Sequence, residues 1–428
     1  MTELGEIPSE WDVRTINDLI KENIIIDVMD GNHGEIHPKA SDYVDIGIPF
    51  IMANNLKNGK LDIEDCKFIS YEQAKSLRKG FAREGDVLLT HKGTLGETAI
   101  VPKLKDEYIM LTPQVTYYRL SDNNVLINRY LKIYFDSKKY QDKLKSFGSQ
   151  STRDYVGITE QRKLSIVLPT IEEQEEIASI LSTVDEQIDN VDALIEKNKE
   201  LKKGLMQTLL TKGIGHTKFK KTEIGEIPEE WQVKRLGNVC EVKSSKRVYQ
   251  SDYIDSGVPF YRSKEIIELS KGNLPTVELF IARDKFEEFK EKYGVPKLGD
   301  LMITSVGSVG KTWVCDGREF YYKDGNLTQI ISNNEINTKY ISYVFECEYL
   351  IKQYLGQSSG SAQVALTLEK LKNLLVIFPT IKEQEKIASI LSEVDKKIEE
   401  YENKKQKLEE LKKGLMQQLL TGMIRVTV

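Results

Sequence analysis

The amino-acid sequence contains the same two segments twice. Leu168-Pro-Thr-Ile-Glu-Glu-Gln-Glu-Glu-Ile-Ala-Ser-Ile-Leu-Ser182 returns 210 residues later as Phe378-Pro-Thr-Ile-Lys-Glu-Gln-Glu-Lys-Ile-Ala-Ser-Ile-Leu-Ser392. Leu201-Lys-Lys-Gly-Leu-Met-Gln-Thr-Leu-Leu-Thr211 returns at the same distance as Leu411-Lys-Lys-Gly-Leu-Met-Gln-Gln-Leu-Leu-Thr421. The residues that precede each copy are far less alike. The chain therefore repeats one framework around two dissimilar regions. This arrangement is suited to holding two different regions in a fixed spatial relation.

A further repeat marks the start of each half. Thr2-Glu-Leu-Gly-Glu-Ile-Pro-Ser-Glu-Trp11 matches Thr222-Glu-Ile-Gly-Glu-Ile-Pro-Glu-Glu-Trp231 at a distance of 220 residues. This distance falls to 210 within each half, so the first middle region is the longer one. A period of this size is far above that of solenoid repeats. We expect a duplicated unit made of a globular region followed by a helix.

Composition excludes several classes of protein. A length of 428 residues suggests two or more domains. With 30% charged residues and no apolar run of about 18 residues, no membrane span is expected. The N-terminus lacks the basic start and apolar stretch of a signal peptide. The four cysteines stand apart from one another, so the sequence predicts a cytoplasmic protein without a disulfide framework.

Neither histidine nor net charge identifies a site. His33 and His37 have a spacing that would share a helix face, but Gly34 and Pro38 place them in a loop, so a metal site there is not expected. The net charge of −5 gives no overall basic surface. Any contact with nucleic acid must therefore be local, or partner proteins must supply part of the phosphate contact.

The middle of each half reads as mixed strand and helix. Apolar, β-branched runs bounded by glycine and proline predict strands, and each run in the first half has a counterpart in the second. The predicted strands are residues 47–52, 85–90 and 115–120, matched by 257–261, 299–304 and 329–331. A helix is expected near residues 128–145, with a counterpart near 338–355.

The repeated tails predict two long helices. Thr170 with Glu173, and Thr380 with Glu383, form capping boxes at the helix starts. Gly213 and Gly422 follow the last apolar turns as stop residues. Each helix would have about 40 residues and a length of roughly 60 Å.

The apolar residues of both tails step alternately by four and three, the spacing of a coiled coil. They are Ile177, Leu181, Val184, Ile188, Val191 and Ile195 in the first tail, and Ile387, Leu391, Val394, Ile398 and Tyr401 in the second. Asn198 and Lys405 are polar members that could fix the register. The alternative is that each helix lies on its own globular region, but the length argues for pairing. Near-identity of the helices favours an antiparallel over a parallel pair. The expected fold is α+β: two globular mixed α/β regions separated by an antiparallel coiled coil, with a pseudo-twofold internal repeat.

Motifs for catalysis are weak. Ser305-Val-Gly-Ser-Val-Gly-Lys-Thr312 is similar to a phosphate-binding loop, but the first required glycine is Ser305. The equivalent segment of the other half, Lys92–Thr98, has Glu97 where Lys311 stands. The segment is better explained as a glycine-rich turn between strands. No arrangement typical of a methyltransferase or hydrolase is present, and the sequence predicts a chain that is not an enzyme.

Loops that differ between the halves carry groups suited to DNA. Arginine and lysine can contact guanine or phosphate, and asparagine can contact adenine, although any surface loop carries such residues. The candidates are Asn32, His33, Lys92, Thr94 and Arg153 in the first half, and Lys246, Arg247, Arg262, Lys264, Ser308 and Lys311 in the second.

Two glycines inside the predicted helices need an explanation. Gly204 and Gly414 each cost roughly 1 kcal/mol of helix stability relative to alanine. Either the paired helices cross closely there, or another protein docks there.

The repeated Pro-Thr-Ile-x-Glu-Gln and Leu-Lys-Lys-Gly-Leu-Met-Gln segments, with the Gly-Glu-Ile-Pro-x-x-Trp entry, resemble the specificity subunit of type I restriction–modification enzymes. The resemblance covers essentially the whole chain. It implies two target-recognition domains, each for one half of a split, asymmetric DNA site, with the helices as a spacer. It also implies two methyltransferase subunits and restriction–translocation subunits as partners. S-adenosylmethionine, ATP and Mg²⁺ would then be bound by those partners, with no cofactor in this chain.

On this interpretation the chain divides at residues 1–168 (first recognition domain), 169–212 (first helix), 213–378 (linker and second recognition domain) and 379–428 (second helix). Two other functions stay open. A self-contained restriction or methylation enzyme would need motifs that are not found, and a scaffold without base recognition would show no sequence preference.

Overall fold

The computed structural model describes residues 7–122, 124–148, 155–356 and 365–427. The chain forms two compact units, one from residues 1–192 and 403–428 and the other from residues 193–402. Each unit therefore combines one globular region with part of both long helices. The divisions expected at residues 168, 212 and 378 fall inside these units.

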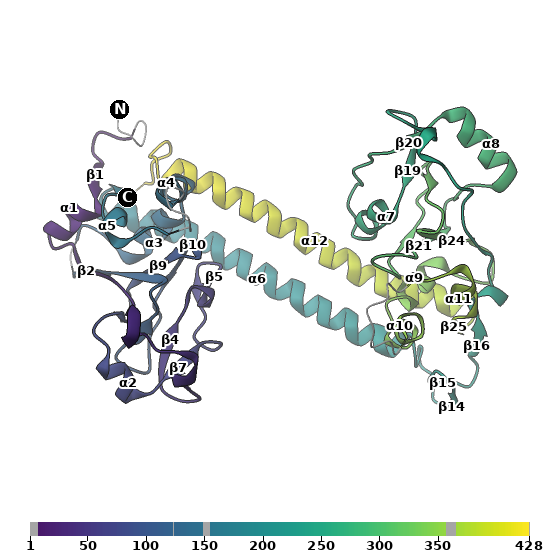
Figure 1. The fold of residues 1–428 in the computed structure, drawn as a ribbon, viewed down its shortest axis with the longest axis horizontal. Coiled ribbons are helices and arrows are strands. Elements are labelled where there is room, and N and C mark those ends of the chain that lie inside the picture. Colours follow the sequence, from purple (N-terminus) through teal and green to yellow (C-terminus); the bar gives the residue numbers. More distant parts are fainter. Residues whose placement is uncertain (1–6, 123, 149–154, 357–364, 428) are drawn as a thin grey trace. The chain divides into compact units, whose positions relative to one another are not determined.

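The first unit has a globular region with two larger sheets (Figure 1). Its strands are β1 (Asp12–Thr15), β2 (Ile25–Asp30), β3 (Tyr43–Val44), β4 (Ile48–Ile51), β5 (Leu56–Lys57), β6 (Lys60–Leu61), β7 (Lys67–Ile69), β8 (Phe81–Ala82), β9 (Val87–Lys92), β10 (Thr94–Ile100), β11 (Ile109–Leu111), β12 (Val115–Leu120) and β13 (Ser165–Leu168). Its helices before the long one are α1 (Ile16–Lys21), α2 (Tyr71–Ser76), α3 (Asn128–Asp136), α4 (Lys138–Gly148) and α5 (Ile158–Gln161), with 3₁₀ turns at Gly34–Ile36, Ala40–Asp42 and Ala53–Asn55.

The second unit is built in the same way. Its strands are β14 (Phe219–Thr222), β15 (Gly225–Pro228), β16 (Gln232–Arg235), β17 (Val242–Lys243), β18 (Tyr253–Ile254), β19 (Val258–Tyr261), β20 (Phe280–Ile281), β21 (Leu301–Thr304), β22 (Thr312–Val314), β23 (Tyr321–Tyr322), β24 (Leu327–Ile330) and β25 (Leu375–Phe378). Its helices are α7 (Ser263–Ser270), α8 (Arg283–Tyr293), α9 (Thr338–Val344), α10 (Glu348–Leu355) and α11 (Leu368–Asn373), with 3₁₀ turns at Leu236–Asn238 and Gln250–Asp252.

One sheet corresponds strand by strand between the two units, while the other has five strands in the first unit and four in the second. The corresponding sheet has the order β10-β9-β12-β2 in the first unit and β22-β21-β24-β17 in the second, with antiparallel neighbours throughout. The other sheet contains a parallel pair in each unit, β4 with β11 and β19 with β23. The first strand of each globular region pairs with its last, β1 with β13 and β16 with β25. The six strands predicted from the sequence are confirmed.

The predicted middle helices are each broken in two. The break between α3 and α4 is at Ser137, whose backbone is extended (ψ 140°). The Ser137 hydroxyl donates to the carbonyl of Tyr134 and accepts from the amide of Tyr140, so it ends one helix and begins the next. In the second unit Cys347 has the same extended backbone (ψ 140°) between α9 and α10.

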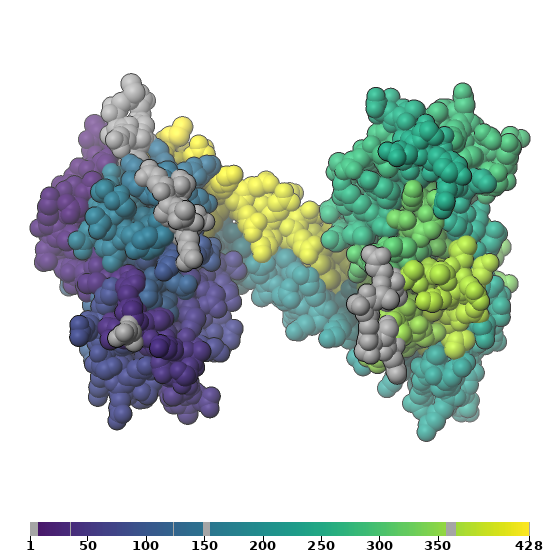
Figure 2. All heavy atoms as spheres, viewed as in Figure 1, coloured from purple at the N-terminus to yellow at the C-terminus, as the bar shows by residue number. Residues whose placement is uncertain are grey.

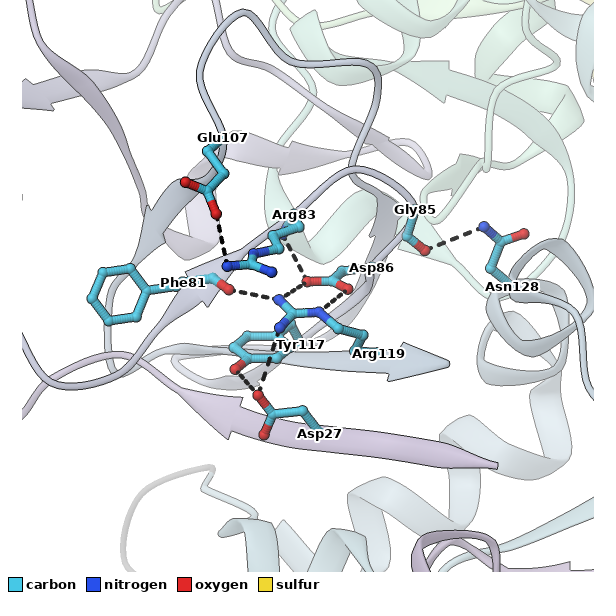
Figure 3. Close-up of polar contacts among 9 residues, drawn as sticks. All are labelled: Asp27, Phe81, Arg83, Gly85, Asp86, Glu107, Tyr117, Arg119 and Asn128. Atoms are coloured by element: carbon cyan, nitrogen blue, oxygen red, sulfur yellow. Dashed lines mark hydrogen bonds and ion pairs between the residues drawn. The ribbon is translucent and has the colours of Figure 1, made fainter. Parts of the chain in front are cut away.

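A buried ion pair braces the first sheet (Figure 3). Arg119 donates to both carboxylate oxygens of Asp86, at 2.9 and 2.7 Å, and to the carbonyl of Phe81 at 2.7 Å. The Asp86 side chain is 2% exposed. Burial raises the pKa of the Asp86 carboxyl, against the hydrogen bonds from Arg119 that lower it. The guanidinium also lies 4.8 Å from the centre of the Tyr117 ring.

The long helices are α6 (Ile171–Leu209) and α12 (Ile381–Leu419), each continuous over 39 residues. In the first unit Asp185 pairs with Lys412 at 2.6 Å and Asp192 with Lys405 at 2.7 Å. In the second unit Lys202 pairs with Asp395 at 2.9 Å. As the residue numbers of the partners rise along α6, those of the partners on α12 fall. The predicted antiparallel pairing is therefore confirmed within each unit. Most seam residues are buried, including Leu181 and Leu391 at 0% exposure.

The two polar seam residues behave differently. Lys405 makes the ion pair with Asp192 across the seam, which suits the register role predicted for it. Asn198 donates at 2.8 Å to the carbonyl of Leu194 on its own helix instead. Among the described residues, no helix has both the length and the apolar character needed to cross a membrane.

The repeated segments meet at a joint between helix start and globular region. In the first unit the Trp11 ring nitrogen donates to Glu173 at 2.7 Å; in the second, Trp231 donates to Glu383 at 2.9 Å. The next residue is Gln174 in the first unit and Gln384 in the second. Gln174 donates to the carbonyl of Val125, just before α3, and Gln384 donates to the carbonyl of Glu335, just before α9. The Thr170 and Glu173 capping box is present. The repeated Glu-Gln therefore fixes each long helix to its own globular region.

Each joint is closed by the end of the other long helix. Gly213 and Gly422 have φ of 68° and 69°, as expected for stop residues. A Cβ at Gly213 would lie 2.4 Å from the Trp231 ring, and one at Gly422 would lie 2.3 Å from Pro8. Leu419 and Leu420 share a buried cluster with Trp11 and Leu181. Figure 2 shows the C-terminal end of α12, in yellow, against the blue atoms of the first globular region.

Candidate nucleic-acid interface

Most of the described candidate residues lie in or beside the loops at one end of the four-stranded sheet in each unit. In the first unit β2 and β9 end there, while β10 and β12 begin there. In the second unit the corresponding ends belong to β17, β21, β22 and β24. The shared topology therefore brings together loops that are far apart in the sequence.

In the first unit these loops are organised around a buried carboxylate, Asp30, at the end of β2. Lys79 donates to one of its oxygens, and His33 lies 2.7 Å from the other. Burial alone would raise the pKa of the Asp30 carboxyl, but the hydrogen bonds from Lys79 and His33 outweigh it, and the pKa is lowered. His33 has 48% of its side chain exposed, so it is held in place and still accessible.

Asn32 is not available to read a base, which corrects the sequence-based prediction. It is 2% exposed. Its amide nitrogen donates to the carbonyl of Lys79 at 2.6 Å, and its oxygen accepts from the amide of Arg78 at 3.1 Å. With donor and acceptor both used by backbone groups, Asn32 ties its loop to the segment that carries Lys79.

His91, on β9, is a buried member of the same cluster. Its Nδ1 is 2.7 Å from the Thr116 hydroxyl, and its Nε2 is 4.0 Å from Asp30. The ring is 0% exposed, and burial lowers the pKa of His91 to about 4. His91 is therefore neutral near pH 7, and it supports the loop without adding charge to it.

The turn between β9 and β10 carries Lys92 and Thr94, both exposed. Gly93 in the turn and Gly96 in β10 have φ of 83° and 95°, which side chains rarely adopt. The Thr90 hydroxyl accepts from the amide of Glu97 at 2.9 Å. Gln141, on α4, donates to the carbonyl of Gly96 at 2.8 Å. These contacts fix the backbone of the turn.

The equivalent segment of the second unit is a longer loop, residues 305–311, with other side chains. Gly307 and Gly310 have φ of 79° and 81°, and the Thr304 hydroxyl accepts from the amide of Lys311 at 3.0 Å. Thr94 therefore corresponds to Ser308, and Glu97 to Lys311. The segment from Ser305 to Lys311 joins β21 to β22, so the glycine-rich turn predicted there is confirmed.

Two more candidates occupy matching positions. The strand registers place Met29 opposite Tyr117, and Lys243 opposite Gln329. Tyr117 and Gln329 are equivalent, because they pair with Leu88 and Met302 at matching positions of β9 and β21. Counting onward, Asn32 and His33 correspond to Lys246 and Arg247. Lys246 is exposed, with its ammonium 5.8 Å from the centre of the Tyr293 ring. Arg247 is 65% exposed and donates to Asp324 at 2.8 Å.

Arg262 and Lys264, at the start of α7, reach the same end of the sheet but are paired with carboxylates. Arg262 donates to Glu265 and Glu278, and Lys264 donates to Glu278 at 2.6 Å. The hydrogen bond from Lys264, followed by that from Arg262, lowers the pKa of Glu278 to about 2. These two cations would have to exchange a carboxylate for phosphate before contacting DNA.

Among the cationic candidates of the described second unit, Lys311 has no carboxylate partner within 4.0 Å, and the same is true of Lys246. Sequence reasoning did not select Glu97, the counterpart of Lys311. The sequence signal that could have identified Glu97 is the equal spacing from Thr90 to Glu97 and from Thr304 to Lys311. Arg153 lies outside the described residues.

Gly204 and Gly414 are exposed. No described atom lies within 4 Å of the place where a Cβ would stand at either one. The close helix crossing considered above is therefore wrong. Nearby, Leu201 and Leu411 are 50% and 51% exposed, so each unit presents the same open, partly apolar helix surface.

The comparisons with known proteins agree with this construction. A family described as the type I restriction modification DNA specificity domain matches residues 8–201 and 228–410. The type I restriction enzyme MjaVIII specificity subunit of Methanocaldococcus jannaschii is 27% identical, over 98% of this chain and 94% of its own. The S subunit of a type I restriction–modification system from M. genitalium has a similar fold, with a TM-score of 0.57 at 17% identity over 98% of both chains. Another structure, from work on the assembly and conformational transition of a type I system, gives 0.58 at 16% identity, over 98% of this chain and 100% of that one. The chain belongs to the family of type I restriction–modification specificity subunits, and it carries the family's DNA specificity domain twice.

Proposed function

We propose that the two globular regions read the two halves of a split, asymmetric DNA site through the loops described above. The observation that supports this most directly is the match of loop positions. Equivalent segments, each with a threonine that accepts from the amide seven residues later and a matching pair of glycines with positive φ, carry Thr94 and Glu97 in one unit and Ser308 and Lys311 in the other. Fixed loops with different donors and acceptors are what recognition of two different base sequences requires.

Exchange of one region tests this proposal. Replacing residues 12–168 with those of another family member should change one half of the methylated sequence and leave the other half unchanged. The measurement is modified-base sequencing of cells that carry the complete system. The reciprocal exchange of residues 232–378 should change only the other half. A change in both halves from either exchange would contradict independent reading.

We propose that the long helices set the spacing between the half-sites. Residues of α6 belong to both compact units, and α6 is a single helix of 39 residues. Inserting seven residues after Val191, with a matching insertion in α12, keeps the seam in phase. The methylated site should then have a longer gap between unchanged half-sites. Insertion of five residues is the out-of-phase control, and we expect it to abolish methylation.

We further propose that the surfaces around Gly204 and Gly414 each dock one methyltransferase subunit. Their support is exposure and repetition: two identical stretches, each with open space above the glycine. Gly204→Arg should leave a complex with one methyltransferase subunit, and the double variant with Gly414→Arg should leave none, as measured by native mass spectrometry. Asn190→Arg, on an exposed part of α6, is the control. A double variant that retains two subunits would overturn this docking site.

On this proposal the chain is not itself an enzyme. The methyltransferase subunits bring S-adenosylmethionine, and restriction–translocation subunits bring ATP and Mg²⁺. Methyl transfer by the purified chain alone would contradict it.

A further inference from the structure

Glu97 and Lys311 occupy the same place in the two units but have opposite charge. Their amides donate to Thr90 and Thr304 in the same way, and each follows a glycine with positive φ. Those glycines pack against the helices that follow: a Cβ at Gly96 would lie 2.1 Å from Gln141, and one at Gly310 would lie 2.5 Å from Tyr354. The backbone at both positions is therefore held before any ligand arrives, which lowers the entropy lost on binding.

Both side chains are available. Lys311 is exposed and Glu97 is partly exposed. Among the described residues, neither makes a side-chain hydrogen bond or ion pair, in contrast to Arg247, Arg262 and Lys264 with their carboxylates. A carboxylate without a cationic partner on a DNA-binding surface is unfavourable near phosphate, because like charges repel. The same carboxylate is favourable if it accepts a hydrogen bond from a base instead of lying near a phosphate.

We propose that Glu97 and Lys311 are specificity-determining residues for the two half-sites, Glu97 for a cytosine and Lys311 for a guanine. In the major groove, the amino group at N4 makes cytosine a donor, and a carboxylate can only accept. Guanine presents the O6 and N7 acceptors, which match an ammonium that can only donate. The inference rests on the proposed function, and it assigns one base position in each half-site to the corresponding turn.

The test is binding of the assembled complex with its methyltransferase subunits to duplexes in which each base pair of the site is varied. Glu97→Gln should lose the preference for cytosine at one position, by about 5- to 150-fold, the equivalent of roughly 1–3 kcal/mol for a base contact. The same position should gain tolerance of adenine, because glutamine pairs with the adenine N6 and N7 groups. Lys311→Glu should lose the guanine preference at one position of the other half-site.

Charge controls come from the opposite end of the same strands. Glu84 and Lys297 are exposed, and they precede β9 and β21. Glu84→Lys and Lys297→Glu should leave the preference at every position unchanged. The Glu97→Gln and Lys311→Glu proteins should also bind the methyltransferase subunits normally, which separates loss of base reading from failure to fold or assemble.

Three outcomes would overturn the inference: an unchanged base preference, a uniform change in affinity for all sequences, or a change in both half-sites from one substitution. The exchange of residues 12–168 distinguishes these from failure of the proposed function. If the exchange alters one half-site while Glu97→Gln alters nothing, the region reads DNA through other residues. If the exchange alters nothing, the proposed function itself is wrong.

Discussion

The two units have the same construction and differ in the groups that stabilise it. In the first unit the buried Asp86 is neutralised by Arg119, whereas the corresponding Asp300 accepts from the neutral Gln329 at 2.6 Å. A buried histidine, His91, bonds to Thr116 in the first unit; in the second, Ser305 bonds to Thr328 at 2.8 Å. At the joints Arg425 contacts Glu173, and His216 contacts Glu383. The duplicated framework thus retained its geometry while charge was redistributed within it.

The largest expected difference in stability between the two units comes from the buried ion pair of Arg119 and Asp86. Arg119→Leu leaves Asp86 buried without its guanidinium partner, and we expect the first unit to lose about 3 kcal/mol of unfolding free energy. Gln329→Leu removes one neutral donor from Asp300, which keeps the amides of Lys297 and Ser332 at 2.8 and 2.9 Å, so we expect a loss of roughly 1–2 kcal/mol. Denaturant-dependent hydrogen exchange, resolved by unit, measures both. Equal losses would show that the charge of Arg119 is unimportant.

The next difference is in the response to pH. The pKa of His91 is about 4 in the fold, because the ring is buried, against an ordinary value of 6.5. Between these values the unfolded chain binds the proton more readily, so stability of the first unit should fall as pH falls from about 6.5 to about 4. The full effect is about 3 kcal/mol.

His91→Ser copies the second unit and should remove that dependence, although loss of packing lowers stability at pH 7. Thermal unfolding of both proteins at several pH values is the measurement. An unchanged pH slope after His91→Ser would refute the assignment.

A smaller effect is expected at the joints. Arg425→Ala removes a 2.7 Å contact with Glu173, which is 2% exposed and keeps its bond from Trp11. We expect the first unit to lose less stability than Arg119→Leu removes, because the Arg425 side chain is 43% exposed. Arg425→His gives the first unit the residue that the second unit has at this position. It should lose less stability than Arg425→Ala, since His216 makes the matching contact with Glu383 at 2.9 Å. Protection of the Trp11 indole from exchange reports on the joint directly.

The smallest effect belongs to the helix pairs. Lys412→Met breaks the pair with Asp185, where the side chains are 24% and 36% exposed, and we expect a loss below about 1 kcal/mol. Lys202→Met should cost slightly more, because Lys202 contacts Glu346 at 3.4 Å as well as Asp395. Both losses should shrink in high salt. A loss of stability that does not depend on salt would indicate that the aliphatic part of the lysine side chain contributes through packing.

Local patterns predicted the fold well where the deciding contacts are local. Heptad spacing and terminal glycines identified α6 and α12, because helix formation depends on neighbours three and four residues apart. The break at Ser137 was missed, since a serine can either continue a helix or cap the next one. The joint was also missed as a contact, because Trp11 and Glu173 are 162 residues apart.

The candidate site was predicted in outline only. The variable loops do gather in each unit, because equivalent strands end at the same edge of the sheet. Individual side chains could not be judged from sequence. Asn32 proved to be occupied by backbone groups, and the carboxylate that engages Lys264 is Glu278, on a separate segment.

The closure of the first unit by the end of the chain has a consequence for synthesis on the ribosome. Trp11 shares its buried cluster with Leu419 and Leu420, so this core cannot close until these two leucines have been made. At roughly 5–20 residues per second, the stretch between Leu168 and Leu420 takes about 13–50 seconds to appear. Residues 193–402, by contrast, form the second unit without a break in sequence. The first unit therefore completes its core only after the residues of the second unit have been made.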